Sequence, residues 1–534
     1  MVTSKNQRIW ILILMGLSVF IIMLDGNVVP IALPVIMKDT HSSFQASSWV
    51  ITSYVIAFTA LLVPLGQLAD KFGRRRIVTY AIVVFGLSSL LCGISWSLAW
   101  LLIGRVLQGI AGGVIFPASL AIIVLTFPKE RRGTAIGVWG GISAIAAAIG
   151  PSIGGFVTHY LSWRWIFFLN IPITLFVLAM ITTSVPESRG VKRSIPIFGG
   201  VLLGGTLTFL SVSLIQAPTW GWASLKEIEC LAAFAVFLLV FIFSQVRSSN
   251  PVLPLSFFRR RAYSAANLVG VFTSILSVAV LLVLPFWLEE IEGFSALRAS
   301  VEITPLAVAA MIAAPITGRL IDRVGARIPA LAGTSILTVS ILCIAYTLSP
   351  AHPNELIPFT ALGGFGLGMS LIAISNAATA DIDSERIVEG TAIWSMTRQA
   401  GFVVGICLVV TVLSTYWTIN IGDVLNTVPF KVNGIRVPTT LRIAALHAVE
   451  NLKNGSIGDP STERFAMNGL TGLQGIASEF VKILHQMVAD AARRAFRAMY
   501  LLIGFIGFGG IVASAFLPGK KSEMHGSVKS TEVE

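Results

Sequence analysis

Long apolar stretches recur along the entire chain and are separated by short polar connections. A helix needs about 20 apolar residues to cross a hydrocarbon core about 30 Å thick. By this criterion the pattern predicts fourteen spanning helices, near residues 9–31, 49–68, 77–96, 98–125, 134–158, 164–185, 195–216, 228–246, 265–288, 300–318, 329–348, 357–377, 391–417 and 498–517. We therefore expect an all-α polytopic membrane protein.

A charged segment between the second and third stretches recurs in degraded form between the tenth and eleventh. Gly66–Arg76 and Gly318–Arg327 place Gly, Leu, Asp, Gly and Arg at the same spacing, 252 residues apart. Such a repeat indicates a duplicated membrane protein whose halves rock against each other. Because eight stretches separate the copies, we expect two six-helix bundles, 1–185 and 263–534, with a helix pair inserted at 186–262.

Basic residues gather on one side of the predicted bundle. If the N-terminus is cytoplasmic, the clusters at 71–76, 129–132, 189–193, 247–261 and 319–327 all fall in cytoplasmic connections. The opposite short connections hold only Lys38, Arg164, Lys226 and Arg298. The positive-inside rule therefore predicts an inner (plasma) membrane protein with both termini, including the tail 518–534, in the cytoplasm.

One outward connection, 418–497, is long and contains nine Lys and Arg residues, which the rule tolerates because long loops translocate regardless of charge. Residues 476–491 have helical apolar spacing, which predicts an external helix leading into the last span. The alternative is a docking surface for a partner, for which a periplasmic adaptor protein is the candidate.

Composition supports a membrane class. Hydrophobic residues make up 55% of the chain and charged residues 12%, whereas soluble proteins carry about 25% charged residues. The net charge of +12 is spread over the connections, so it reflects topology and predicts no nucleic-acid partner. Neither a cysteine or histidine cluster nor a phosphate-binding GxxxxGK[ST] loop is apparent. We expect no metal and no cofactor, and an ion gradient as the source of energy.

Asp25 is the only carboxylate that the pattern places deep in a span. It follows Trp10 by 15 residues, about 22 Å of helix rise, which places it in the outer half of the hydrocarbon region. A charge there costs about 2.5–3.5 kcal/mol, so it needs a partner or a wet cavity. Arg105 is the matching embedded cation, and Gln108 lies one turn later. We expect these three residues to couple transport to protons; the alternatives are an Asp25 that reaches the outer interface and a purely structural Arg105.

The repeated loop predicts a conformational latch. Two glycines permit a tight turn between antiparallel helices, and the acid can meet a helix N-terminus or an arginine. The alternative is a topology signal made only of positive charge. The expected latch residues are Gly66, Asp70, Gly73, Arg74, Asp322 and Arg327.

Several motifs together resemble the major facilitator superfamily, in particular its 14-spanner drug:proton antiporter branch (EmrB/QacA-type). Besides the loop, they are Leu24-Asp25 with Ala32-Leu33-Pro34, the Arg105-to-Gly113 segment, Gly150-Pro151 with Gly154-Gly155, and Trp163–Pro172. The chain departs from the branch pattern at Asn27, Pro30 and Ala326.

The resemblance implies a major facilitator fold, a proton-coupling role for Arg105 and a bent fifth helix that controls exchange. That helix carries the small-residue set Gly137, Gly150, Pro151, Gly154 and Gly155. Small residues also simply permit close helix packing, which is the plainer interpretation. Candidates for the substrate cavity are Asn27, Tyr54, Phe116 and Trp139, with Trp165 and Trp394 as further aromatic candidates.

The resulting expectation is a proton-coupled antiporter that exports lipophilic small molecules or drugs by alternating access. An uptake symporter or facilitator on the same fold is one alternative. A non-transporting scaffold acting through 418–497 is another. An enzyme is not expected, because no nucleophile–base pair is apparent in the sequence.

Overall fold

Helices dominate the computed structural model of the chain. The structure describes residues 5–188, 195–348, 356–380, 382, 387–427, 431–432, 435–436, 446, 449 and 476–519. Fourteen helical spans in this part of the chain are long and apolar enough to cross a membrane. The predicted number of spans and the predicted fold class are therefore confirmed.

The elements fall into three groups along the chain. The first comprises α1 (Lys5–Thr40), α2 (Phe44–Phe72), α3 (Arg74–Gly93), α4 (Leu98–Thr126), α5 (Lys129–Tyr160), α6 (Trp165–Phe168) and α7 (Asn170–Ser184). The inserted pair is α8 (Ile197–Trp220) and α9 (Leu225–Arg247). The third comprises α10 (Leu255–Phe258), α11 (Arg261–Val278), η1 (Ala279–Val283), α12 (Leu284–Phe286), η2 (Trp287–Ile291), α13 (Ala296–Val324), α14 (Arg327–Thr347), α15 (Leu356–Ala380), α16 (Ile387–Thr427) and α19 (Ile476–Ser514).

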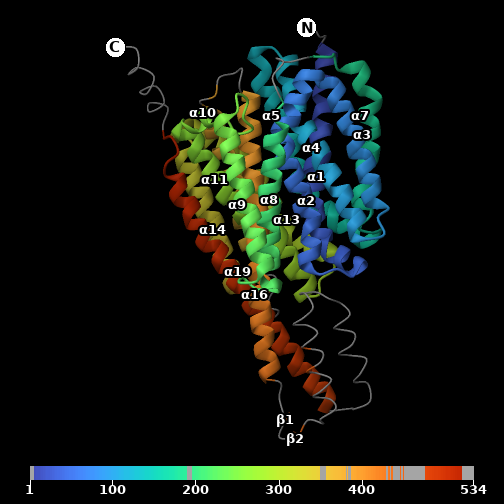
Figure 1. Ribbon diagram of the computed structural model, residues 1–534, viewed down its shortest axis with the longest axis vertical. Coiled ribbons are helices and arrows are strands. Elements are labelled where there is room, and N and C mark those ends of the chain that lie inside the picture. The colour runs from blue at the N-terminus through green and yellow to red at the C-terminus, as the bar shows by residue number, and fades with distance from the viewer. Residues whose placement is uncertain are drawn as a thin grey trace.

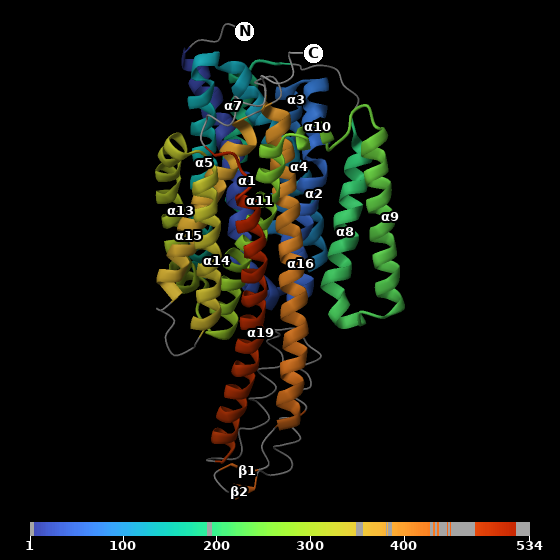
Figure 2. The same cartoon turned by 90° about the vertical axis from the view of Figure 1, so that its left-hand side faces the viewer.

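The helix ends differ from the prediction mainly beside the long connection. α16 continues to Thr427, ten residues beyond the predicted end at 417, and the predicted external helix is continuous with the last span in α19. Both helices extend past the rest of the bundle (Figures 1 and 2). Strands β1 (Lys431–Val432) and β2 (Ile435–Arg436) pair antiparallel beyond them. The rest of the predicted 418–497 connection, and the tail from residue 520, lie outside the described residues.

α1 begins and α19 ends at the same end of the bundle, called the terminal end below; the opposite end is the distal end (Figure 2). The inserted pair stands to one side in the same view. α8 packs on α2 and α16, and a Cβ on Gly200 would lie 2.8 Å from the Ala60 carbonyl oxygen. α9 is the most exposed span, with 17% of its apolar window buried, so it faces lipid. The domain boundaries 1–185, 186–262 and 263–534 stay a prediction.

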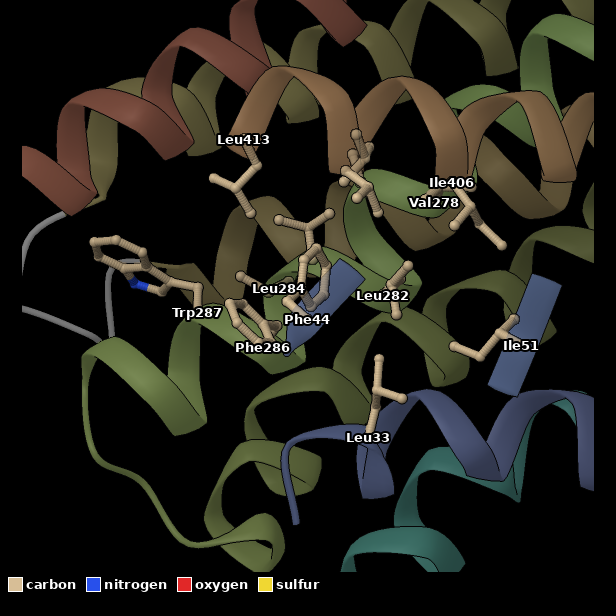
Figure 3. Close-up of a cluster of buried hydrophobic side chains, with 14 of the residues drawn as sticks. Leu33, Phe44, Ile51, Val278, Leu282, Leu284, Phe286, Trp287, Ile406 and Leu413 are labelled. Carbon is tan, nitrogen blue, oxygen red and sulfur yellow. The ribbon is translucent and has the colours of Figure 1, made fainter. Parts of the chain in front are cut away.

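The two halves meet in an apolar cluster near the distal end. Figure 3 shows Leu33, Phe44 and Ile51 of α1 and α2 close to side chains of the α11–η2 segment. The ring centroids of Phe44 and Phe286 are 4.4 Å apart. Polar contacts reinforce the closure. Lys38 Nζ lies 2.8 Å from Glu290 Oε1, and Gln45 Nε2 donates to Ser414 Oγ at 3.3 Å.

Helix α5 is packed differently along its length. At its distal end Ser152 Oγ lies 2.9 Å from Thr304 Oγ1 of α13. Nearer the terminal end, no atom lies within 4 Å of the place where a Cβ on Gly137 or Gly141 would be. The described conformation is therefore one in which the halves are in contact at the distal end, while the face of α5 that carries Gly137 and Gly141 is open nearer the terminal end.

Candidate functional site

Asp25 lies inside the first bundle, on a helix whose other residues are almost all apolar. It is 1% exposed, and Arg105 of α4 is also 1% exposed. Arg105 Nη1 donates to Asp25 Oδ2, so the two form an ion pair with no access to solvent. A buried pair of this kind depends on further hydrogen bonds to satisfy its remaining donors and acceptors.

Amide side chains supply those hydrogen bonds. Gln108 Nε2 donates to Asp25 Oδ1 at 3.2 Å, and Asn170 Nδ2 of α7 donates to the same oxygen at 3.1 Å. Gln108 Oε1 accepts from Arg105 Nη1 at 2.9 Å, and its amide donates to Ser89 Oγ of α3 at 2.8 Å. The structure thus brings together the predicted Asp25, Arg105 and Gln108. The sequence analysis missed Ser89 and Asn170, although Asn170 falls in the family-like segment Trp163–Pro172.

Arg105 also contacts α2. Its Nε donates to the Val50 carbonyl oxygen at 2.9 Å, and its Cζ lies 4.2 Å from the centre of the Tyr54 ring. The Tyr54 hydroxyl is buried without a hydrogen-bond partner among the described residues. Tyr54 was expected to line a substrate cavity. In this conformation it is 3% exposed and forms part of the charged network.

The chemistry of this network follows from its donors. Arg105, Gln108 and Asn170 all direct N–H groups at the Asp25 carboxylate, so the described arrangement fits the ionised acid. A proton on Asp25 would cancel the charge that holds Arg105, and one of the neighbouring amides would have to turn to accept it. Protonation of Asp25 would therefore weaken the present contacts between α1, α4 and α7.

Burial of acids is not confined to Asp25. Glu227 at the start of α9 is fully buried, and Glu289 in η2 is 6% exposed. Glu289 Oε1 has no hydrogen-bond partner among the described residues. Both lie at the distal ends of their helices. The apolar sequence pattern ends there, but neighbouring helices still bury these side chains.

Three of the other predicted cavity residues, Phe116, Trp139 and Asn27, are packed within the first bundle, whereas Trp165 is exposed. The ring centroids of Phe58 and Phe116 are 6.0 Å apart, and those of Phe116 and Trp139 are 5.2 Å apart. Trp139 Nε1 donates to Ser119 Oγ at 3.3 Å. Asn27 Nδ2 donates to the Met23 carbonyl oxygen of its own helix at 2.7 Å. Their role in substrate binding stays a prediction.

The repeated loop has a glycine with positive φ in both halves. Gly73 joins α2 to α3 with φ +114°, and Gly325, with φ +80°, is followed by Ala326 before α14 begins. These values suit glycine, because a Cβ is strained at positive φ. Arg74 Nε lies 2.7 Å from Asp70 Oδ1. A Cβ on Gly66 would lie 3.3 Å from the Pro117 side chain of α4, which explains a small residue there.

Glu187, beyond the end of α7, holds the first loop and was missed by the sequence analysis. Its carboxylate accepts from the backbone N–H groups of Arg75 and Arg76, at 3.1 Å each. An acid at a helix N-terminus is stabilised by the helix dipole. The expected latch stays a prediction. In the second copy, Arg327 begins α14 and is exposed, and the side chain of Asp322 lies outside the described residues.

Small residues on α5 set its contacts with both halves. A Cβ on Gly150 would lie 2.8 Å from Asn27 Cβ, and one on Gly154 would lie 3.0 Å from the Val28 carbonyl oxygen, both on α1. A Cβ on Gly155 would lie 2.6 Å from the Ala296 carbonyl oxygen of α13. Pro151 is buried between these contacts. Gly155 therefore belongs to the distal contact between the halves, whereas Gly137 does not.

Gly155→Val is expected to weaken the distal closure, because the added side chain would overlap the α13 backbone. A cysteine at Gln45, in a protein without other cysteines, should then react severalfold faster with a water-soluble maleimide added from the distal side. Gly137→Val is the matched control, since open space surrounds that position. Equal rates in both variants would show that Gly155 does not govern closure.

Comparison with known proteins places these observations in a family. Residues 15–406 match the sequence profile of the Major Facilitator Superfamily. The puromycin resistance protein pur8 of Streptomyces alboniger is 32% identical over 423 residues, covering 76% of this chain and 82% of that protein. The multidrug resistance protein Stp of Mycobacterium tuberculosis is 30% identical over 418 residues, covering 77% of each. The tetracenomycin C resistance and export protein of Streptomyces glaucescens is 29% identical over 415 residues, covering 77% of this chain and 76% of that protein.

Solved structures share the fold at low sequence identity. A bacterial homologue of the human lysosomal transporter Spinster, in an inward-facing and unoccupied conformation, matches with a TM-score of 0.63 and 15% identity, covering 96% of this chain and 98% of that one. A D-xylose–proton symporter matches with a TM-score of 0.54 and 15% identity, covering 77% of this chain and 90% of that one. At this identity the likeness concerns the fold alone.

Proposed function

Because this chain belongs to the major facilitator superfamily, we propose that it exports lipophilic small molecules in exchange for protons. It is a multi-pass membrane protein with fourteen spans among its described residues, as in the 14-spanner branch. Relatives named for multidrug and puromycin resistance support export of drug-like compounds. In this role the chain moves its substrate across the membrane without changing it chemically.

The terminal end faces the cytoplasm in this proposal. The basic cluster Lys71–Arg76 lies at that end, in the last turn of α2 and the first turn of α3, and such clusters mark the cytoplasmic side. The described conformation, closed at the distal end, is then the one that receives substrate from the cytoplasm or the inner leaflet. Export requires the reverse arrangement, in which the distal contacts open.

Proton coupling rests on one observation, the buried Asp25 carboxylate held by three N–H donors. In the distal-closed form this acid is ionised and paired with Arg105. When the distal end opens, a proton from outside reaches Asp25 and releases Arg105, Gln108 and Asn170 from it. The proton leaves to the cytoplasm when the network forms again, which resets the carrier.

Dye accumulation in cells tests this function. Cells that produce the protein should hold less of a lipophilic fluorescent dye than cells that lack it, and an uncoupler should remove the difference. Export that persists in the presence of the uncoupler would contradict proton coupling. Higher accumulation in producing cells would favour the rival uptake carrier.

Substrate charge is expected to be limited because Asp25, the acid inside the first bundle, is already paired. Asp25 is paired with Arg105, and an unpaired buried ion costs several kcal/mol, so a rigid dication would find no compensation there. We expect neutral, zwitterionic or monocationic amphiphiles to displace a bound monovalent dye far better than dications do. Equal displacement by dications would contradict this prediction. It would direct attention to Glu289, the buried acid without a partner for Oε1.

A further inference from the structure

Two buried donors on one face of α16 have no acceptor. Arg398 Nε and Trp394 Nε1 are both inaccessible to solvent, and neither makes a hydrogen bond within the part of the chain that the structure describes. The two residues are one helical turn apart, and Arg398 Cζ lies 5.6 Å from the centre of the Trp394 ring. Unsatisfied buried donors are uncommon in folded proteins, and each points to a missing acceptor.

Charge compensation is missing as well. No carboxylate among the described residues lies within ion-pair distance of the Arg398 guanidinium. The span that contains it begins at Glu389. Arg398 is nine residues further on, about 14 Å of helix rise, so the guanidinium lies inside the apolar span. An arginine at this depth marks a functional site, because its cost must be offset by a partner.

The surroundings suit a planar ligand. α16 packs on α11 in its own half and on α2 in the other half, so it lies where the two halves meet. Gly270 of α11 faces the indole, and a Cβ there would be 3.7 Å from Trp394 Nε1, so no α11 side chain at this position reaches the N–H group. Next to it, Thr397 donates its hydroxyl to Asn267 Oδ1, and Asn267 Nδ2 donates to the Tyr263 carbonyl oxygen at 2.8 Å. These neighbours are already satisfied, which leaves Trp394 Nε1 and Arg398 Nε for a ligand.

We propose that Trp394 and Arg398 bind an oxyanion, such as a carboxylate, carried by an aromatic amphiphile that the protein exports. Arg398 pairs with the anionic oxygen, Trp394 Nε1 donates to an oxygen of the same group, and the indole ring packs on the aromatic part. This inference rests on the proposed export function and narrows its substrates to those with an acidic or zwitterionic group. Asp25 is already paired with Arg105, so among the described residues the unpaired charge where the two halves meet is the positive charge of Arg398.

Rhodamine B and its ethyl ester provide the test, because they share one ring system and differ in a free carboxylate. Binding is measured by dye fluorescence polarisation with purified protein in phosphatidylcholine nanodiscs, with no ion gradient. Wild type should bind rhodamine B at least about tenfold more tightly than the ester, since hydrogen bonds to charged groups carry energies of this size. Arg398→Gln should lower affinity for rhodamine B about tenfold and leave the ester unchanged.

Further variants separate recognition from folding. Arg398→Lys keeps the charge and should retain part of the preference, and Trp394→Phe keeps the ring and should weaken binding of rhodamine B more than of the ester. If Arg398→Gln is not monodisperse in gel filtration, the binding of the two dyes to Arg398→Lys and Trp394→Phe tests the proposal instead. Wild type without a preference for the acid, including no binding of either dye, would overturn the proposal. Equal loss of both dyes in every variant would do the same.

An anionic lipid headgroup offers the same chemistry and is distinguished by a second arm. Phosphatidylglycerol is added to the nanodiscs in place of part of the phosphatidylcholine. If Arg398→Gln changes binding of this lipid but not the acid–ester preference, the oxyanion belongs to a lipid and the proposal is wrong. Because the assay uses no gradient, failure of dye export in cells would count against the export function alone.

Discussion

Asp25→Asn is expected to reduce pH-driven uphill export to background. It is also expected to lower the stability of the protein, because the buried Arg105 guanidinium loses its counter-charge. The amide has the size of the acid, and its oxygen can still accept from Arg105. Its NH₂ group can be accommodated because Asn170 Oδ1 has no hydrogen-bond partner, so the Asn170 amide can turn and accept from it. The variant cannot take up or release a proton, however, so nothing links the gradient to the two conformations.

The measurement uses purified protein in liposomes with an imposed pH gradient and a fluorescent substrate. Substrate counterflow without a gradient should remain near the wild-type rate in Asp25→Asn, which separates lost coupling from lost folding. Asp39→Asn on the same helix is the matched control, because Asp39 is 44% exposed and pairs with Arg164 at the surface. If Asp25→Asn concentrates substrate as well as Asp39→Asn does, the coupling role of Asp25 is wrong.

Arg105→Ala is expected to cost about 3–5 kcal/mol of folding stability, because it leaves the buried Asp25 carboxylate without its counter-charge. It also removes the donor to the Val50 carbonyl oxygen. Thermal unfolding of the purified protein, followed by loss of monodisperse material, should show a clearly lowered midpoint.

The double variant Asp25→Asn with Arg105→Ala tests the cause. Removing the stranded charge should restore much of the midpoint, while uphill export stays absent. A double variant no more stable than Arg105→Ala alone would show that the ion pair is not the source of the loss. The double variant is thus expected to regain folding stability without regaining proton-driven export.

The sequence predicted the spans and the charged pair because both follow from the cost of polarity in lipid. Apolar length alone defines a span, and an isolated Asp25 or Arg105 in such a stretch must have a partner. Their common site on α1 and α4 could be anticipated from the family resemblance. The ends of α16 and α19 could not, since beyond the membrane a helix continues through polar residues that hydropathy does not register.

The rest of the site depends on packing between distant segments. Ser89 and Asn170 are small polar residues of a kind that is frequent in spans, and nothing in the sequence shows which face of the bundle they meet. Glu187 binds the start of α3 over 100 residues earlier in the chain, so no local pattern indicates it. Tyr54 was assigned to a cavity because it is aromatic, whereas its ring lies on the Arg105 guanidinium.

Proton movement driven by substrate tests the central claim most directly. Liposomes containing purified protein and an internal pH indicator are loaded with substrate and diluted into substrate-free buffer at the same pH, with the membrane voltage clamped. As substrate leaves, protons should enter and the interior should acidify with wild type, and no pH change should occur with Asp25→Asn. Substrate efflux without acidification in wild type, or unchanged acidification in Asp25→Asn, would contradict an antiporter that works through the buried Asp25–Arg105 pair.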